Sequence, residues 1–258
     1  MAILASAFSR SAPSILASLP DAIWHDQAGA YRSKPMGSGY RALDQELPNG
    51  GWPASVMIEL LLAHPGAAEL RLLAPTLARI TQAGKTVVLL APAHIPYAAT
   101  LTELGIDMDK IIVIAADKPA DRIWAVEQAL QSASFGALLC WLPQARADHM
   151  RRLQLAAAAA QGLTFVFRPL DAQDQASPAP LRMICQPLAG GRMSVDIIKR
   201  RGPVHGEPIV LPLALPEMLL QPFATRSLAR PIWHGAAYGV DRFALAATAA
   251  RHRAALPS

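Results

Sequence analysis

Cysteine and charge are both scarce in this chain of 258 residues. Its two cysteines, Cys140 and Cys185, are too few for a disulfide framework, and Cys140 lies in an apolar strand pattern. We therefore expect a reducing, cytoplasmic compartment and no catalytic role for either thiol. Charged residues make up 17% of the chain, against about 25% in an ordinary globular protein. This shortage of charge suggests that a partner covers part of the surface.

Long apolar runs and metal-binding clusters are also missing. The apolar stretches are too short or too rich in proline to span a bilayer, and the apolar start at residues 1–5 has no positive residue before it. The seven histidines show no metal-ligand spacing with cysteine or carboxylates. No Gly-x-Ser-x-Gly elbow occurs. The sequence therefore predicts no membrane insertion, no export and no metal site.

Strand and helix patterns alternate along most of the chain, which is typical of a parallel sheet with helices on both faces. We expect strands at 56–62, 86–91, 111–115, 137–142 and 164–168. We expect helices at 69–83, 97–104, 120–132 and 146–161. A linker at 171–180 is followed by a predicted β-hairpin at 182–187 and 193–200, turning at Gly190-Gly191. The predicted class is α/β with a mostly parallel sheet.

Residues 57–71 have the strand, loop and helix start of a phosphate-binding loop without its nucleotide-binding residues. An intact loop reads G-x-x-x-x-G-K-[ST], where the lysine reaches the phosphates and the hydroxyl holds magnesium. Here no lysine occurs between residues 34 and 85. The degenerate positions are Pro65, Gly66, Ala68 and Glu69. A carboxylate at the helix start repels a triphosphate, so we expect no bound nucleotide. The other interpretation is an ordinary strand, turn and helix.

Residues 36–169 resemble the core of RecA-type recombinases in the order and spacing of their motifs. The lead-in Met36 to Pro53 contains a Leu-Asp pair and a Gly-Gly step, and a strand ending in Glu59 follows. The resemblance implies a RecA-like fold in which three further catalytic positions have been replaced, at Ala93, Trp141 and Arg168. Because phosphoryl transfer needs metal, charge neutralisation and water positioning together, we expect a non-enzymatic protein without cofactors.

Charge is distributed unevenly between the two ends of the chain. Residues 1–180 carry 14 Lys and Arg against 15 Asp and Glu, whereas residues 181–258 carry 10 against 4. We divide the chain into an N-terminal segment 1–35, a core 36–206 and a proline-rich basic tail 207–258. Because its prolines prevent a long helix, we expect this irregular tail either to lie extended against the core or to become ordered on binding a partner.

Basic and aromatic residues of the second half are candidate contacts to a partner protein or to DNA phosphates. They are Lys199, Arg200, Arg201, Arg226, Arg230 and Trp233. The alternative for the arginines is a solvated basic surface, since they are widely spaced and have few aromatic residues between them.

Several motifs together resemble the ImuA family, RecA-like proteins of the SOS-induced mutagenesis cassette. The motifs are Gly37 to Asp44, Gly50 to Pro53, Glu59 to Leu62, Pro65-Gly66, Glu69 to Leu73 and Phe167 to Pro169. The resemblance implies a cytoplasmic, non-catalytic adaptor of translesion DNA synthesis. Its expected partners are a polymerase-like ImuB homologue, an error-prone polymerase subunit and RecA, with DNA bound through the basic tail and no membrane contact.

Two other interpretations remain. The SulA family of SOS-induced division inhibitors, which bind the tubulin-like FtsZ, resembles the same degenerate core. SulA proteins are usually shorter, so the length and the proline-rich tail favour ImuA. A residual nucleotide-binding enzyme is disfavoured by the missing lysine.

Overall fold

The structure is a computed structural model that describes residues 35–66, 68–132, 134–202 and 206–216. The predicted N-terminal segment therefore lies outside the described residues, apart from its last residue. The candidate contacts Arg226, Arg230 and Trp233 lie outside them as well.

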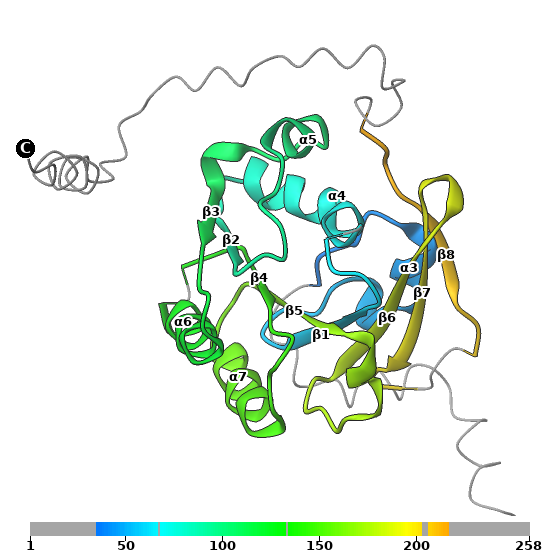
Figure 1. The fold of residues 1–258 in the computed structure, drawn as a ribbon. Coiled ribbons are helices and arrows are strands. Elements are labelled where there is room, and N and C mark those ends of the chain that lie inside the picture. Colours follow the sequence, from blue (N-terminus) through cyan, green and yellow to red (C-terminus); the bar gives the residue numbers. More distant parts are fainter. Residues whose placement is uncertain (1–34, 67, 133, 203–205, 217–258) are drawn as a thin grey trace, which may run out of the picture. The chain divides into compact units, whose positions relative to one another are not determined.

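An eight-stranded sheet forms the centre of the described part, in the order β3-β2-β4-β5-β1-β6-β7-β8 (Figure 1). The strands are β1 Met57–Leu62, β2 Val87–Leu90, β3 Ile111–Ile114, β4 Ala137–Trp141, β5 Leu163–Pro169, β6 Leu181–Leu188, β7 Arg192–Lys199 and β8 Ile209–Pro212. The six strands from β3 to β6 pair in parallel, whereas β7 and β8 are antiparallel additions. The predicted mostly parallel sheet is confirmed.

Helices cover both faces of the parallel part of the sheet (Figure 1). They are α3 Arg41–Glu46, α4 Glu69–Gln82, α5 Ala98–Glu103, α6 Pro119–Ser132 and α7 Ala147–Ala159. Short 3-10 helices are η1 Pro48–Gly50, η2 Met108–Lys110, η3 Leu170–Asp174 and η4 Ala189–Gly191. The chain runs from β1 to β3 in one direction along the sheet and returns from β3 to β5 in the other. Because such crossovers are right-handed, the reversal of direction places α4 and α5 on one face and α6 and α7 on the other.

Alternating strand residues divide the core into two clusters, one on each face. In β1, Ile58 and Leu60 pack in a cluster that also contains Leu72 and Leu77 of α4. The neighbouring Met57 belongs to the second cluster, which is built largely from α6, α7 and the opposite faces of β2 and β4. The near-continuous apolar composition of β1, β2 and β4 follows from this burial on two sides.

The C-terminal additions to the sheet agree with the predicted hairpin and extend it. β6 and β7 pair antiparallel around η4, where Gly190 and Gly191 both have φ of 72°. The start of the predicted tail forms β8 on the edge of β7, so the tail begins by lying extended against the core. The predicted linker is more ordered than we expected, because η3 lies in it and Ala172 is buried.

Candidate functional site

The loop between β1 and α4 is filled by a side chain of its own helix. Glu69 is 2% exposed, and its carboxylate accepts hydrogen bonds from the backbone N–H of Gly66 (2.5 Å) and of Ala68 (3.2 Å). Backbone N–H groups at this position would hold phosphate in an intact phosphate-binding loop. In this protein the Glu69 carboxylate occupies two of the N–H groups of the loop, those of Gly66 and of Ala68, the residue just before α4.

Two neighbouring strands support this loop. The indole Nε1 of Trp141, the last residue of β4, donates to Oε1 of Glu69 at 3.1 Å. Gly66 has φ of 86°, and a Cβ at this position would lie 2.2 Å from the ring of His94, which follows β2. The structure therefore brings together the predicted positions Gly66, Ala68, Glu69 and Trp141. The loop is tightly packed against the ends of β2 and β4.

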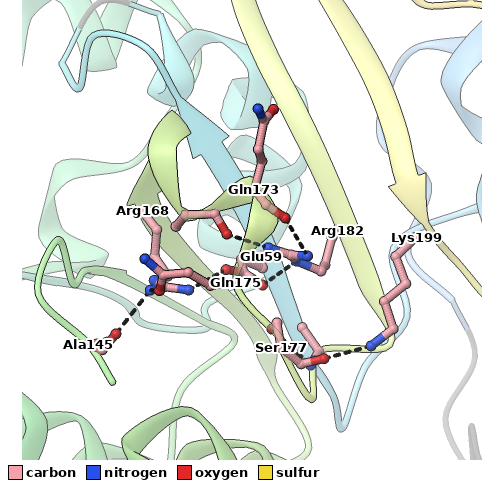
Figure 2. A network of polar contacts seen from close by, with 10 residues as sticks. Glu59, Ala145, Arg168, Gln173, Gln175, Ser177, Arg182 and Lys199 are labelled. Atoms are coloured by element: carbon pink, nitrogen blue, oxygen red, sulfur yellow. Dashed lines mark hydrogen bonds and ion pairs between the residues drawn. The ribbon is translucent and has the colours of Figure 1, made fainter. Parts of the chain in front are cut away.

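A buried ion triad lies in the adjoining part of the sheet, as Figure 2 shows. Glu59 of β1 is 0% exposed and pairs with Arg168 of β5 (Nη1 to Oε1, 3.0 Å) and with Arg182 of β6 (Nε to Oε2, 2.8 Å). The parallel register sets Arg182 directly opposite Glu59. Arg168, which stands at one of the catalytic positions that the RecA resemblance gives as replaced, is here the partner of a buried carboxylate.

The two arginines of the triad also hold the chain that connects β5 to β6 (Figure 2). Arg168 donates to the carbonyl of Ala145 (2.9 Å) and to Oε1 of Gln175 (2.6 Å). Arg182 donates to the carbonyls of Ala172 (2.9 Å) and Gln173 (3.2 Å). The buried guanidinium groups cannot bond to water, so their N–H donors need acceptors within the protein. The predicted linker supplies such acceptors, and these bonds explain why it is ordered.

Sequence reasoning missed this triad, although a signal was present. Glu59, Arg168 and Arg182 each interrupt an apolar strand pattern, and charged groups in buried strands are almost always paired. The pairing itself required knowledge of the strand order, because β1 lies between β5 and β6.

The predicted basic contacts at the end of β7 have intramolecular partners. Lys199 donates to the carbonyl of Ser177 at 2.7 Å (Figure 2). Desolvation lowers the pKa of Lys199, and the charge of Arg182 adds to this effect. Arg200 pairs with Oε2 of Glu46 at 2.8 Å and also donates to the carbonyl of Glu46. Arg201 is exposed. A contact of these residues with a partner or with DNA stays a prediction.

A shallow apolar cavity of about 230 Å³ lies beside the filled loop. Its walls come from the loop before α4, the loop after β2, and α5. Ile95 is 90% exposed and Tyr97 is 59% exposed, and both line the cavity. We call this surface the Ile95 groove. No sequence motif predicted this groove, although Ala91-Pro-Ala-His-Ile-Pro-Tyr97 places apolar residues in a proline-interrupted loop.

The part of the chain that the structure describes offers neither a metal-binding cluster nor an exposed thiol. No group of three or more His, Cys, Asp or Glu residues there could hold a metal ion. Burial raises the pKa of Cys140, and it raises the pKa of Cys185 to about 12, so neither thiol is a nucleophile at neutral pH. None of the described helices has the length and apolar character that crossing a membrane requires.

Comparison with known proteins identifies relatives of the region that contains this site. Residues 56–165 match the model of the family described as "Cell division inhibitor SulA". This region begins just before β1 and ends within β5, so it includes the filled loop and the Ile95 groove.

Individual relatives carry the same description. The chain is 26% identical over 156 residues to cell division inhibitor SulA of Yersinia enterocolitica, covering 58% of this chain and 93% of that protein. It is 29% identical over 101 residues to the proteins of that name from Yersinia pestis and Yersinia pseudotuberculosis. Those two alignments cover 39% of this chain and 60% of each relative.

These matches correct the main functional interpretation of the sequence. We expected an ImuA-type adaptor of translesion DNA synthesis, and this is wrong, because the family match and the relatives are cell division inhibitors. The expected ImuB homologue, error-prone polymerase, RecA and DNA contacts are untested. Across the strands and helices that build the site, the chain is similar to SulA, which was the alternative.

Proposed function

We propose that this chain is a SulA-like inhibitor of cell division, induced in the SOS response and acting in the cytoplasm by binding FtsZ. The proposal is supported by the match of residues 56–165 to the SulA family and by the relatives named cell division inhibitor. FtsZ is the partner that the resemblance to SulA implies.

The observation that carries the proposal is the position of Glu69 next to the Ile95 groove. The Glu69 carboxylate occupies two N–H groups of a loop that resembles a phosphate-binding loop in its position between strand and helix, and the adjoining surface presents Ile95 and Tyr97 to solvent. Exposed apolar side chains beside a cavity are typical of protein interaction sites. The arrangement favours a protein ligand at a place where related architectures bind nucleotide.

We also propose that the core is RecA-like and has no ATPase activity. Ala93 and Trp141 supply no carboxylate at the positions where the resemblance expects catalytic acids, and Arg168 is bound to Glu59. A chain with this set of residues cannot position magnesium and water together. We expect no ATP hydrolysis above the rate without protein.

The test is the effect of the purified full-length chain on FtsZ from the same organism. We expect the wild type to reduce FtsZ GTPase activity and sedimentable polymer. Ile95→Glu should weaken this inhibition by about tenfold or more, because a charge would be buried in an apolar contact. Leu155→Glu is the matched control, since Leu155 is also exposed (75%) but lies on α7, on the other sheet face.

Two results would count against the proposal at different levels. If Ile95→Glu inhibits FtsZ as well as the wild type does, the Ile95 groove is not the contact surface. If the wild type neither binds FtsZ nor changes its polymerisation, and its expression does not make cells filamentous, the chain is not a division inhibitor of this type.

A further inference from the structure

A second cavity, of about 470 Å³, opens on the α6 and α7 side of the sheet. The first turns of α6 and α7 and the loop between β4 and α7 form its walls. Ile123 and Leu142 give it an apolar part. Its volume is in the range of small-molecule sites, which are mostly apolar with a few convergent polar groups.

The ionisable side chains that line this cavity are all basic. Arg122, Arg146 and His149 contribute to its walls, and no Asp or Glu is among its lining residues. The nearest acidic neighbours in sequence are Asp121 and Asp148. Nε2 of His149 lies 3.8 Å from a carboxylate oxygen of Asp148. Arg122 is anchored through Nε, which donates to the carbonyl of Ala116 at 2.6 Å.

A smaller cavity of about 150 Å³ adjoins the first and shares Arg122 and Pro143 with it. Its walls contain Arg168 and, again, no carboxylate. The Arg168 side chain is 3% exposed, and its buried Nε has no hydrogen-bond partner among the described residues. The Glu59 carboxylate that pairs with Arg168 also pairs with Arg182, so the triad carries more positive than negative charge. The smaller cavity therefore borders a region with unbalanced positive charge.

We propose that these two adjoining cavities bind a small molecule that carries phosphate. Arg122 would lie between the two parts of the site, with Arg146 and His149 at the wider part. Guanidinium groups match phosphate oxygens in a bidentate geometry. The N-terminal ends of the 14-residue α6 and the 13-residue α7 also border the larger cavity, and the positive ends of their helix dipoles favour an anion there, although Pro119 at the start of α6 has no N–H to donate. The smaller cavity shares Ala93 and Trp141 with the Ile95 groove, but none of Arg122, Arg146, His149 and Arg168 lines that groove. The proposed phosphate site goes beyond the proposed binding of FtsZ.

Calorimetric titration of the full-length chain with pyrophosphate tests this site. We expect saturable binding of one pyrophosphate. Arg122→Gln and Arg146→Gln should each weaken binding by about tenfold, because each removes a charge-assisted hydrogen bond. Arg151→Gln is the matched control, since Arg151 is exposed on α7 but does not line either cavity. Thermal unfolding checks that each variant is folded. Because Arg146 is exposed, Arg146→Gln should fold normally and tests the site even if Arg122→Gln is unstable.

ADP and hexaglutamate serve as comparison ligands. If ADP binds more tightly than pyrophosphate and Arg146→Gln loses this binding, the site is supported and its ligand is a nucleotide. Absence of binding by both phosphate compounds overturns the proposal. Equal weakening in Arg151→Gln also overturns it, because the effect would then come from general surface charge. Binding of hexaglutamate without pyrophosphate would show an acidic peptide site in place of the proposed one.

Discussion

Glu59 lies directly opposite Arg182 in the parallel pair of β1 and β6, with 2.8 Å between Oε2 and Nε. Arg168 approaches the other carboxylate oxygen from β5. A single carboxylate thus joins three adjacent strands, β5, β1 and β6, and β6 is the strand to which the antiparallel β7 is added.

Removal of this carboxylate should strongly destabilise the protein. In Glu59→Gln two buried guanidinium groups lose their counter-charge, and breaking a buried pair in this way costs about 3–5 kcal/mol. Urea unfolding followed by circular dichroism measures the change. Arg152→Gln is the control, because it breaks a pair with Glu127 in which the arginine is 62% exposed, and it should cost less than about 1 kcal/mol. If both variants lost a similar amount of unfolding free energy, the buried ion triad would not be the stabilising feature that we describe.

Glu69 should matter for stability through the loop that it fills. Glu69→Ala leaves the N–H groups of Gly66 and Ala68 and the indole of Trp141 without their acceptor. We expect a loss of about 1–3 kcal/mol in the free energy of unfolding. Glu69→Gln should lose less, because it keeps one acceptor oxygen. Asp109→Ala, at an exposed carboxylate in η2, should change stability by less than about 0.5 kcal/mol. An unaffected Glu69→Ala variant would show that the loop does not depend on this side chain.

Lys199 should give the protein a specific dependence on alkaline pH. Its pKa in the folded state is lowered from 10.5, first by desolvation and then by Arg182. Between the lowered pKa and 10.5 the unfolded chain binds more protons, so the contribution of Lys199 to stability rises with pH in this window. Urea unfolding at several pH values between about pH 8 and about pH 10 measures this effect. The free energy of unfolding of the wild type should rise with pH relative to that of Lys199→Met. Lys118→Met, at an exposed lysine, should run parallel to the wild type.

The two thiols should be protected in the native protein. Burial raises the pKa of both, to about 12 for Cys185, so the reactive thiolate is scarce at mildly alkaline pH. We expect a disulfide reagent such as DTNB to label neither cysteine of the native protein rapidly, and to label both once urea unfolds it. Fast labelling without denaturant would contradict the buried positions of Cys140 and Cys185.

Local patterns predicted the strands β1 to β5, the four helices α4 to α7 and the β6–β7 hairpin, but not α3 or β8. The β6–β7 hairpin was predictable because alternation and a Gly-Gly turn are local features. The apolar runs at β1, β2 and β4 predicted buried strands, and the helices between them predicted a parallel sheet. The charged residues inside those strands had no local explanation, and the relation of the chain to SulA or ImuA was misjudged from length and tail composition.

The sequence by itself determined the α/β class, the order along the chain of β1 to β7 and α4 to α7, and the absence of any lysine between residues 34 and 85. Only the tertiary structure decided which partners the buried charged side chains have. It places Glu59 between Arg168 and Arg182. It also directs the Glu69 carboxylate toward the loop that precedes α4, with Ile95 exposed nearby. The physical reason is that each of these contacts joins residues from different strands or loops, and their distances follow from strand order and register, which no local pattern contains.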